Sequence, residues 1–415
     1  MNVLILTHFY PPEPCAASNR TAAVARGLYR AGHGVSVVTG FPSFPTGRVP
    51  ARYRGRLFSR ESDDGIRVTR LWNFVSPVCS SRNRLLNWGT AALATLLYAL
   101  WTFEKVDAVY ASSPPITLAL PSIVAKIRHR CRLVVDVRDA YPEVAVRMGI
   151  WRPNGRITRL VGNVARVLYG FADAIVCVTQ GVGREVLERG AAVAKVCVAA
   201  NGFDSVATDA KHPFARADGA FVVAFVGNMG LAAGTGLILD AAGRSRGASG
   251  MHFVLVGDGS DYETLRRRVR DESLDNVHLL GALPREAAMA VLRDADVCVV
   301  PLRRDIVDSL PTKMFDALWS GCPLLVAANG EARQFLERSE GGWAIPPEDP
   351  DAMATALAAI RLVPLQRAER ARKGRAYVQR HYDRARNVEA IVSVIERACT
   401  SRHSKSVEAV SGDRA

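Results

Sequence analysis

Short apolar segments recur along the chain and alternate with stretches of helical periodicity. The segments are rich in Val, Leu and Ile and contain almost no polar positions. Strands of this kind are buried on both faces, as in parallel sheets that carry helices on each side. The expected strands are Val3–Leu6, Val35–Val38, Ala108–Tyr110, Leu133–Val137, Ala174–Val178, Val222–Val226, Phe253–Val256, Val277–Leu280 and Val297–Val300. The pattern therefore predicts an α/β fold built from doubly wound parallel sheets.

A polar stretch that follows Asn201 interrupts this alternation, and a strand, a glycine and a helix begin again at Val222. A chain of 415 residues is also too long for one ordinary core. Because ligands of such sheets bind beyond the carboxyl ends of the strands, we predict two facing Rossmann-like domains with an interdomain cleft. The predicted parts are a first domain over 1–203, a linker over 204–219, a second domain over 220–375, a helix over 376–400 that packs back toward the first domain, and a flexible tail over 401–415.

One apolar segment departs from this pattern. Leu85 to Phe103 carries no charge, follows Arg82 and Arg84, and has aromatic residues near both ends. Its length is close to the roughly 18 residues of a minimal membrane span, but Gly, Thr and Ala dilute its hydrophobicity. Three interpretations stay open: a buried or cleft-lining helix, a helix that lies on a membrane face, and a true span.

The chain is basic, with 54 Lys and Arg against 40 Asp and Glu and a net charge of +14 at pH 7. Such an excess favours phosphate ligands, anionic lipid or nucleic acid as partners. We find no basic arm, zinc-finger spacing or aromatic RNA-binding signature, and so do not expect nucleic acid. The 8 cysteines are scattered and include no C-x-x-C pair, so we expect reduced, buried thiols. The chain begins directly with a strand and no secretory signal, which predicts a cytoplasmic protein.

The most informative motif runs from Asp308 to Asp316 and reads DSLPTKMFD. Pro311 and Thr312 are typical of the first turn of a helix. A diphosphate could bind the free N–H groups of this helix start, with Lys313 adding positive charge. Asp316, one turn further, could accept hydrogen bonds from ribose hydroxyls, and Asp308 from sugar hydroxyls. A surface helix with two solvated acids has the same spacing, so this alternative stays open.

The motif resembles the E-x7-E region of retaining glycosyltransferases of family 4, which have the GT-B fold. More narrowly, it resembles the P-[ST]-K-x-[FY]-E form of bacterial transferases similar to L-fucosaminyltransferases of surface-polysaccharide synthesis. Further segments match the family in the same order over nearly the whole chain. They are THFYPPE at 7–13 with SNR at 18–20, FPSFPTG at 41–47, VRDAYPE at 137–143, VGNMG at 226–230 and VGDG at 256–259.

The resemblance implies transfer of a sugar, with an N-acetylated amino sugar as one candidate, from a UDP-sugar. The implied acceptor is a lipid-linked or other saccharide in surface-polysaccharide biosynthesis. No cofactor or metal is implied, and the acid pairs Asp258/Asp261 and Asp294/Asp296 lack convergent partners for a metal ion. A lipid-linked acceptor, the basic charge and the Leu85–Phe103 segment together predict a protein that is peripheral on the inner face of the cell membrane.

On the donor side, glycine-rich turns follow the strands of the second domain. The candidate donor-binding residues are Gly227, Asn228, Gly230, Gly257 and Gly281, together with Thr312, Lys313 and Asp316. Glycine lets the backbone approach phosphate oxygens, although a tight turn between strand and helix explains these glycines equally well.

The second domain departs from the family in two ways. Both acids of the E-x7-E region are Asp, and the 230–236 segment lacks the basic residues that many relatives use to hold the diphosphate. Lys313, Arg303 and Arg304 are the nearest candidates for that charge.

On the acceptor side, the resemblance points to His8, Glu13 and Arg20, although a lone His in a loop is more often structural. Asp139 and Glu143 follow a strand, where carboxylates that face a cleft are expected. They and Asp308 are the candidate catalytic acids, and we favour Asp139 for orienting the acceptor or acting as base. Arg138 is expected to oppose the donor phosphates or to pair locally.

Two other functions share this architecture. A non-hydrolysing sugar-nucleotide 2-epimerase would turn over a UDP-sugar without an acceptor. A non-catalytic GT-B protein would bind nucleotide or act as a scaffold at the membrane, because a fold does not by itself imply an activity.

Overall fold

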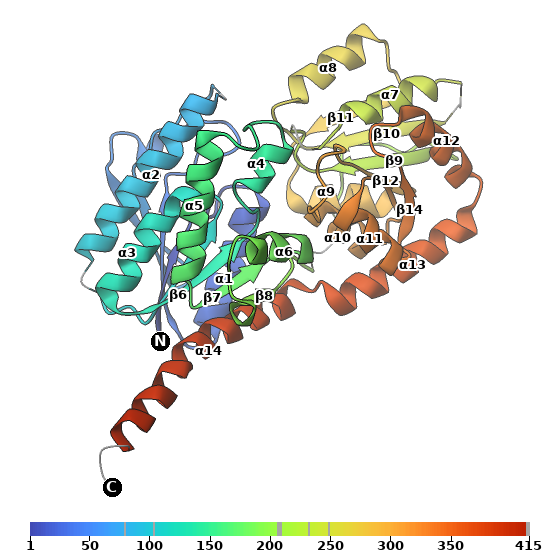
Figure 1. The fold of residues 1–415 in the computed structure, drawn as a ribbon. Helices are drawn as coiled ribbons and strands as arrows, with labels where there is room; N and C mark the ends of the chain where they lie inside the picture. The colour runs from blue at the N-terminus through green and yellow to red at the C-terminus, as the bar shows by residue number, and fades with distance from the viewer. Residues whose placement is uncertain (79, 103, 206–209, 231–232, 248–249, 412–415) are drawn as a thin grey trace. The chain divides into compact units, whose positions relative to one another are not determined.

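The computed structural model describes residues 1–78, 80–102, 104–205, 210–230, 233–247 and 250–411, and side chains as far as residue 400. The chain forms two compact units (Figure 1). Unit 1 comprises Met1–Asn201 and Ala385–Ala415, and unit 2 comprises Gly202–Arg384. Cys79, Phe103, part of the predicted linker and the last residues of the predicted tail lie outside the described residues.

Unit 1 is built on an eight-stranded sheet in the order β3-β4-β2-β1-β5-β6-β7-β8. All neighbouring strands are parallel except the edge pair β3 and β4, which is antiparallel. The strands are β1 (Asn2–Leu6), β2 (Gly34–Gly40), β3 (Phe58–Asp63), β4 (Ile66–Leu71), β5 (Ala108–Ser113), β6 (Arg132–Val137), β7 (Ala174–Cys177) and β8 (Val196–Val198).

Helices cover both faces of this sheet. On one face, α2, α3 and α5 lie side by side (Figure 1) and bury small residues such as Ala99, Ala125 and Ala165. On the other face, α1 and α14 contribute Leu28, Ile391 and others to a second core. The helices of unit 1 are α1 (Ala16–Arg30), α2 (Ser81–Trp101), α3 (Ala119–His129), α4 (Glu143–Arg147), α5 (Arg156–Phe171), α6 (Gln180–Glu188) and α14 (Arg384–Ser411), which enters the unit at Ala385.

Unit 2 has a six-stranded, wholly parallel sheet in the order β11-β10-β9-β12-β13-β14. Its strands are β9 (Phe221–Val226), β10 (Met251–Val256), β11 (Val277–Gly281), β12 (Val297–Pro301), β13 (Leu324–Ala327) and β14 (Gly342–Ile345). Its helices are α7 (Gly236–Arg244), α8 (Tyr262–Asp271), α9 (Arg285–Asp294), α10 (Thr312–Trp319), α11 (Gly330–Ser339), α12 (Pro350–Arg361) and α13 (Pro364–His381).

All nine predicted strands are confirmed. The sequence prediction missed β3 and β4, which form an edge hairpin with alternating exposure, and the short strands β8, β13 and β14. It also ran one helix through the C-terminal region, where the structure ends α13 at His381 and starts α14 at Arg384.

The break between α13 and α14 has a clear physical cause. The Tyr382 ring stacks on Phe315, with centroids 4.6 Å apart, which holds the chain against α10. The backbone of Gly202 lies against the backbone of this break, so that an added Cβ would be 2.4 Å from the Tyr382 carbonyl oxygen. Only glycine fits at this crossing.

The Leu85–Phe103 segment is helical as far as Trp101, where α2 ends. Among the described residues, no helix is both long enough and apolar enough to cross a bilayer.

Candidate active site

The start of α10 in unit 2 offers uncapped backbone N–H groups. Pro311 precedes the helix and makes no capping hydrogen bond, so the amides of Thr312 and Lys313 have no partner from a cap. Such N–H groups, together with the helix dipole, favour an anion. The predicted helix start is thus confirmed, and it has the chemistry of a phosphate site.

Lys313 places a cation beside these amides. Its Nζ lies 4.0 Å from the centroid of the Phe225 ring, and among the described side chains it makes no ion pair or hydrogen bond. Burial lowers the pKa of Lys313 to about 8. An ammonium without an acidic partner in partly dry surroundings gains much from an anionic ligand.

Gly227, at the carboxyl end of β9, makes room for this lysine. A Cβ at Gly227 would lie 3.0 Å from Lys313 Cε, and its φ of 142° is one that other residues rarely adopt.

The other two arginines named as sources of charge are already paired. Arg303 binds Asp305 at 2.9 Å, and Arg304 lies 3.5 Å from Glu348. Of the three cations near the motif, Lys313 is therefore the one without an acid among the described residues.

The glycine turns of unit 2 pack directly against each other. A Cβ at Gly257 would lie 1.9 Å from the Gly227 carbonyl oxygen, and one at Gly259 would lie 2.4 Å from the Met229 carbonyl oxygen. The Gly257 amide also donates to the Gly281 carbonyl oxygen at 2.8 Å. Packing between turns thus accounts for Gly257 and Gly259, whereas Gly227 also borders the lysine.

Asp316 lies one turn into α10, on the same helix as Lys313. Its Oδ1 accepts a hydrogen bond from Arg285 Nη2 at 3.0 Å, and Arg285 is also 3.5 Å from Asp204. Arg384 binds Asp204 on its other side at 2.5 Å. Burial raises the pKa of Asp316, and Arg285 opposes that shift.

Arg285 is a residue that the sequence reasoning missed. It is the first residue of α9 and follows the turn that begins at Gly281. No motif marks it; only the fold brings it to Asp316.

The remaining donor-side candidates occupy neighbouring turns. Asn228 and Gly230 follow β9, and the Asn228 side chain lies against Gly230 and Gly259. Asp308 is half-buried in the segment between β12 and α10. Their contacts with a donor stay predictions.

In unit 1, His8 follows β1 and is buried. Burial lowers its pKa to about 4, although the side chain of Asn87 hydrogen-bonds to it. Its Nδ1 has no hydrogen-bond partner among the described residues. His8 is therefore a neutral imidazole near pH 7, with one buried nitrogen that has no partner among the described residues.

Arg138 and Asp139 follow β6 at the same edge of the sheet. The Arg138 guanidinium donates to the Pro114 carbonyl oxygen at 2.6 Å, and its buried Nε makes no hydrogen bond within the described structure. Asp139 is exposed beside it. Together with His8, they form the polar group at the carboxyl edge of this sheet.

Glu13 acts as a clamp for the loop that carries the FPSFPTG segment. Its Oε1 accepts hydrogen bonds from the backbone amides of Ser43 and Phe44 at 2.9 and 3.0 Å. Burial raises the pKa of Glu13. The structure therefore gives this residue a positioning role, and direct contact with an acceptor stays a prediction.

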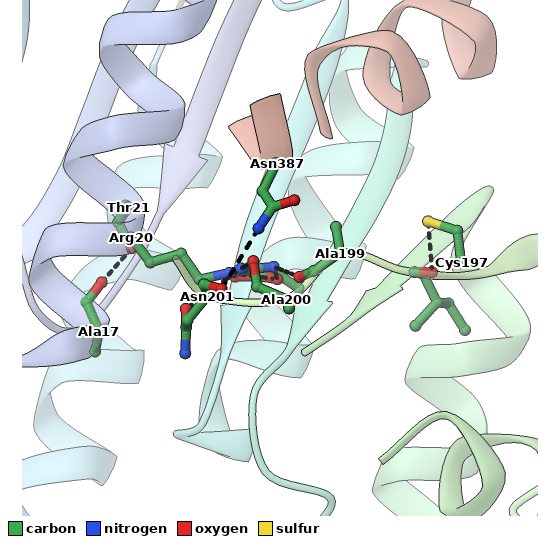
Figure 2. Close-up of polar contacts among 10 residues, drawn as sticks. Ala17, Arg20, Thr21, Cys197, Ala199, Ala200, Asn201 and Asn387 are labelled. Carbon is green, nitrogen blue, oxygen red and sulfur yellow. Dashed lines mark hydrogen bonds and ion pairs between the residues drawn. The ribbon is translucent and has the colours of Figure 1, made fainter. Parts of the chain in front are cut away.

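Arg20 is the most completely bound of the candidates. Its Nη2 lies 2.8 Å from Asp136 Oδ1, and its Nε lies 2.9 Å from Oδ2. The carbonyl oxygens of Ala199 and Ala200 accept further hydrogen bonds at 2.9 and 3.2 Å (Figure 2). The ion pair is buried. Arg20 therefore connects α1 to β6 and to the residues that end the Met1–Asn201 segment of unit 1.

Glu143, the first residue of α4, forms an ion pair with Arg189. The sequence prediction had given it a catalytic role, and nothing in the structure tests that role directly.

Among the described residues, no group of three or more His, Cys, Asp or Glu side chains could hold a metal ion. Asp294 pairs with His212 and Arg293, and Asp296 pairs with Arg216 and Arg367. The described cysteines are all free thiols.

Two models of known families match the chain. The one described as "Glycosyl transferase 4-like domain" matches residues 16–202, almost wholly in unit 1. The one described as "Glycosyl transferases group 1" matches residues 220–361, within unit 2.

Two relatives extend this similarity. WcaI of Escherichia coli strain K12, named as a glycosyl transferase of colanic acid biosynthesis, is 23% identical over 385 residues, which are 88% of this chain and 93% of the relative. WbjE of Pseudomonas aeruginosa, named as a glycosyltransferase, is 22% identical over 66% of this chain and 72% of its own.

Solved structures share the fold. The sucrose-phosphate synthase of Thermosynechococcus elongatus has a TM-score of 0.73 and 16% identity, covering 97% of this chain and 100% of its own. HepE of Anabaena, solved in complex with UDP, has a TM-score of 0.69 and 16% identity, covering 96% and 100%. These neighbours place the two parallel-sheet units in the GT-B fold.

Proposed function

Because the chain is a glycosyltransferase of the GT-B fold that uses a nucleotide sugar, we propose that it performs a retaining transfer from a UDP-sugar in surface-polysaccharide biosynthesis. The name of WcaI supports the pathway class, and the UDP complex of HepE supports the nucleotide. The resemblance to L-fucosaminyltransferases makes an N-acetylated amino sugar the first donor class to test. The matched domains and named relatives are glycosyltransferases, so the epimerase and scaffold alternatives are not carried further.

The observation that carries this proposal is the cation at the start of α10. Lys313 has no acidic partner among the described residues, and the adjacent amides of α10 have no cap. Both groups would stabilise the negative charge that develops on the departing diphosphate. Because that charge is larger in the transition state than in the bound donor, their effect is catalytic.

Asp316 is proposed to bind the ribose hydroxyls of the nucleotide. Burial raises the pKa of Asp316, and Arg285, which hydrogen-bonds to one side of the carboxylate, opposes that rise and favours the ionised form. Asp308 is proposed to contact the donor sugar. The hydrogen bond from Arg285 holds the half-buried Asp316 carboxylate in one orientation, and hydrogen bonds to an ionised group are stronger than those between neutral groups.

The residues at the carboxyl edge of the unit 1 sheet are proposed to bind the acceptor. Asp139 would orient the acceptor hydroxyl, and Arg138 and neutral His8 would hold neighbouring polar groups. In a retaining transfer, an oxygen of the leaving diphosphate can take the acceptor proton, so the proposal requires no strong protein base. It also requires no metal ion.

A lipid-linked acceptor and a position on the inner face of the membrane complete the proposal. The helices α2, α3 and α5 contain no Asp or Glu, and each carries basic residues. Each also exposes bulky apolar side chains, including Leu93, Ile127 and Leu160. Basic helices with apolar exposure suit an anionic lipid surface.

The donor assignment is tested by calorimetric titration with UDP, GDP and ADP in the presence of EDTA. We expect selective binding of UDP and a loss of about tenfold or more in Asp316→Ala, since a hydrogen bond to a charged group contributes about 1.5–3 kcal/mol. Asp351→Ala removes an exposed acid of the same unit and serves as the control. Failure of every nucleotide to bind would refute the proposed donor site.

A further inference from the structure

An apolar groove runs along unit 1 between α2 and the β3–β4 hairpin. It has a volume of about 900 Å³ and is lined mainly by large apolar side chains. Those that protrude most are Leu57, Phe58, Trp72, Leu93, Leu97 and Trp101. The groove belongs to unit 1, whereas the donor-side residues all belong to unit 2.

α2 buries small side chains and exposes large apolar ones, the opposite of an ordinary helix on a protein surface. Its buried positions carry the small residues Ala91, Thr95 and Ala99, whereas Leu93 and Leu97 are 57% and 50% exposed. A helix in contact with water normally turns its leucines toward the core. Contiguous apolar exposure of this kind marks a binding surface, because each buried CH₂ group would contribute about 0.8 kcal/mol.

One end of the groove opens at the carboxyl edge of the sheet, where the acceptor-side residues lie. Trp72 follows β4, and the Thr90 hydroxyl accepts a hydrogen bond from the Phe74 amide at 2.9 Å. One turn earlier on α2, Asn87 reaches both the Phe74 carbonyl oxygen and His8. The groove therefore begins close to His8, one of the predicted acceptor-side residues.

The other end lies at the amino edge of the same sheet. There Glu104 binds Arg67, the second residue of β4, at 2.8 Å. The path from Thr90 to Trp101 covers eleven residues of helix, or about 16 Å. A groove that follows about three turns of helix suits an extended chain better than a compact ligand.

Positive charge gathers at the carboxyl-edge mouth. The loop that leads into Leu57 and β3 carries Arg48, Arg52, Arg54 and Arg56, all exposed, and no acid occurs from residue 41 to residue 60. None of the four makes an ion pair within the described part of the chain. An occupant with an anionic head at this mouth and an apolar body in the groove matches both features.

We propose that this groove binds the hydrocarbon chain of a lipid diphosphate acceptor. The arginine loop holds its phosphates, and the attached saccharide reaches His8, Arg138 and Asp139. This inference rests on the proposed function for the identity of the acceptor. It adds a lipid-binding subsite and an orientation for the lipid: the diphosphate head lies at the carboxyl edge of the unit 1 sheet, and the hydrocarbon chain extends along the groove.

Farnesyl diphosphate is a suitable probe, and tryptophan fluorescence reports its binding because Trp72 and Trp101 line the groove. We expect a saturable change in fluorescence that is smaller in Trp101→Phe, where Trp72 still reports binding. We also expect affinity to fall at least tenfold in Leu97→Glu, which places a charge against the hydrocarbon. Val193→Glu alters an exposed apolar residue of the same unit that does not line the groove, and it should leave affinity unchanged.

UDP titration of the same variants separates this inference from the proposed function. Normal UDP binding shows that the donor site of each variant is intact, and an unchanged circular dichroism spectrum shows that unit 1 is folded. If UDP binds but farnesyl diphosphate does not, the groove proposal is overturned while the donor assignment stands. Equal affinity for pyrophosphate and farnesyl diphosphate, or equal loss in Leu97→Glu and Val193→Glu, would also overturn it.

Discussion

Arg20 in unit 1 and Lys313 in unit 2 are both shielded cations near the carboxyl end of a core strand, yet their surroundings differ. Arg20 has a bidentate carboxylate partner and several carbonyl acceptors. Lys313 has an aromatic ring and no anion among the described residues. The fold therefore satisfies Arg20 with protein groups, whereas Lys313 has no anionic partner among the described residues. From this difference in pairing we predict a structural role for Arg20 and a binding role for Lys313.

The largest effect on stability is expected when the paired cation, Arg20, is removed. Arg20→Ala leaves the carboxylate of Asp136, which is 0% exposed, without its cation. Removing one partner of a buried ion pair costs about 3–5 kcal/mol, so the free energy of unfolding should fall by that amount. Urea unfolding measures the change, with Arg26→Ala as the control for a more exposed arginine on the same helix.

The double variant Arg20→Met with Asp136→Leu makes this test more specific. It removes both charges, and replacing a buried pair by apolar residues is often close to neutral. Recovery of most of the lost stability is expected. A stable Arg20→Ala protein that has lost acceptor binding would instead support the acceptor-contact role predicted for Arg20.

The next largest effect is expected at Lys313, and it has the opposite sign for stability. Lys313→Met removes a shielded charge, so the free energy of unfolding of the ligand-free protein should rise at pH 7. UDP affinity should fall by about tenfold to a hundredfold, because a charge-assisted contact with the diphosphate is lost. Thermal unfolding and calorimetry on the same samples measure the two changes.

The pH dependence of UDP binding sharpens the same comparison. The pKa of Lys313 in the free protein is about 8, so the ammonium is present below that pH and is lost above it. Affinity should therefore fall as the pH rises past about 8, by up to about tenfold per pH unit. Lys313→Arg keeps its charge in this range and should flatten the profile. An unchanged profile in the arginine variant would assign the titration to another group.

The sequence predicted the fold because buried parallel strands are nearly continuous apolar runs. β6 and β12 are two of the runs found in this way. The hairpin of β3 and β4 was missed since an exposed edge alternates polar and apolar residues over only a few positions. Short strands such as β13 also lie next to apolar helices, and sequence period alone does not separate them.

The sequence predicted those site residues that belong to one local motif and missed contacts between residues far apart in the chain. The start of α10 is local in sequence, so Thr312 and Lys313 could be read from the motif. The partner of Asp316 could not, because Arg285 lies 31 residues earlier and meets it only through packing of α9 against α10. The same limit applies to Arg20, whose carboxylate partner is 116 residues away.

The smallest structural effect is expected at Glu143, which makes it a useful test of catalysis. Its ion pair with Arg189 is partly exposed, so Glu143→Gln should change the free energy of unfolding by less than about 1 kcal/mol. If the carboxylate only anchors the start of α4, the kcat for sugar transfer should also stay close to that of the unmodified protein. Arg189→Gln breaks the same pair from the other side and serves as the matched control. A large loss of kcat in Glu143→Gln alone, with normal UDP binding, would show that Glu143 is catalytic, whereas equal small losses in both variants would assign it to the support of α4.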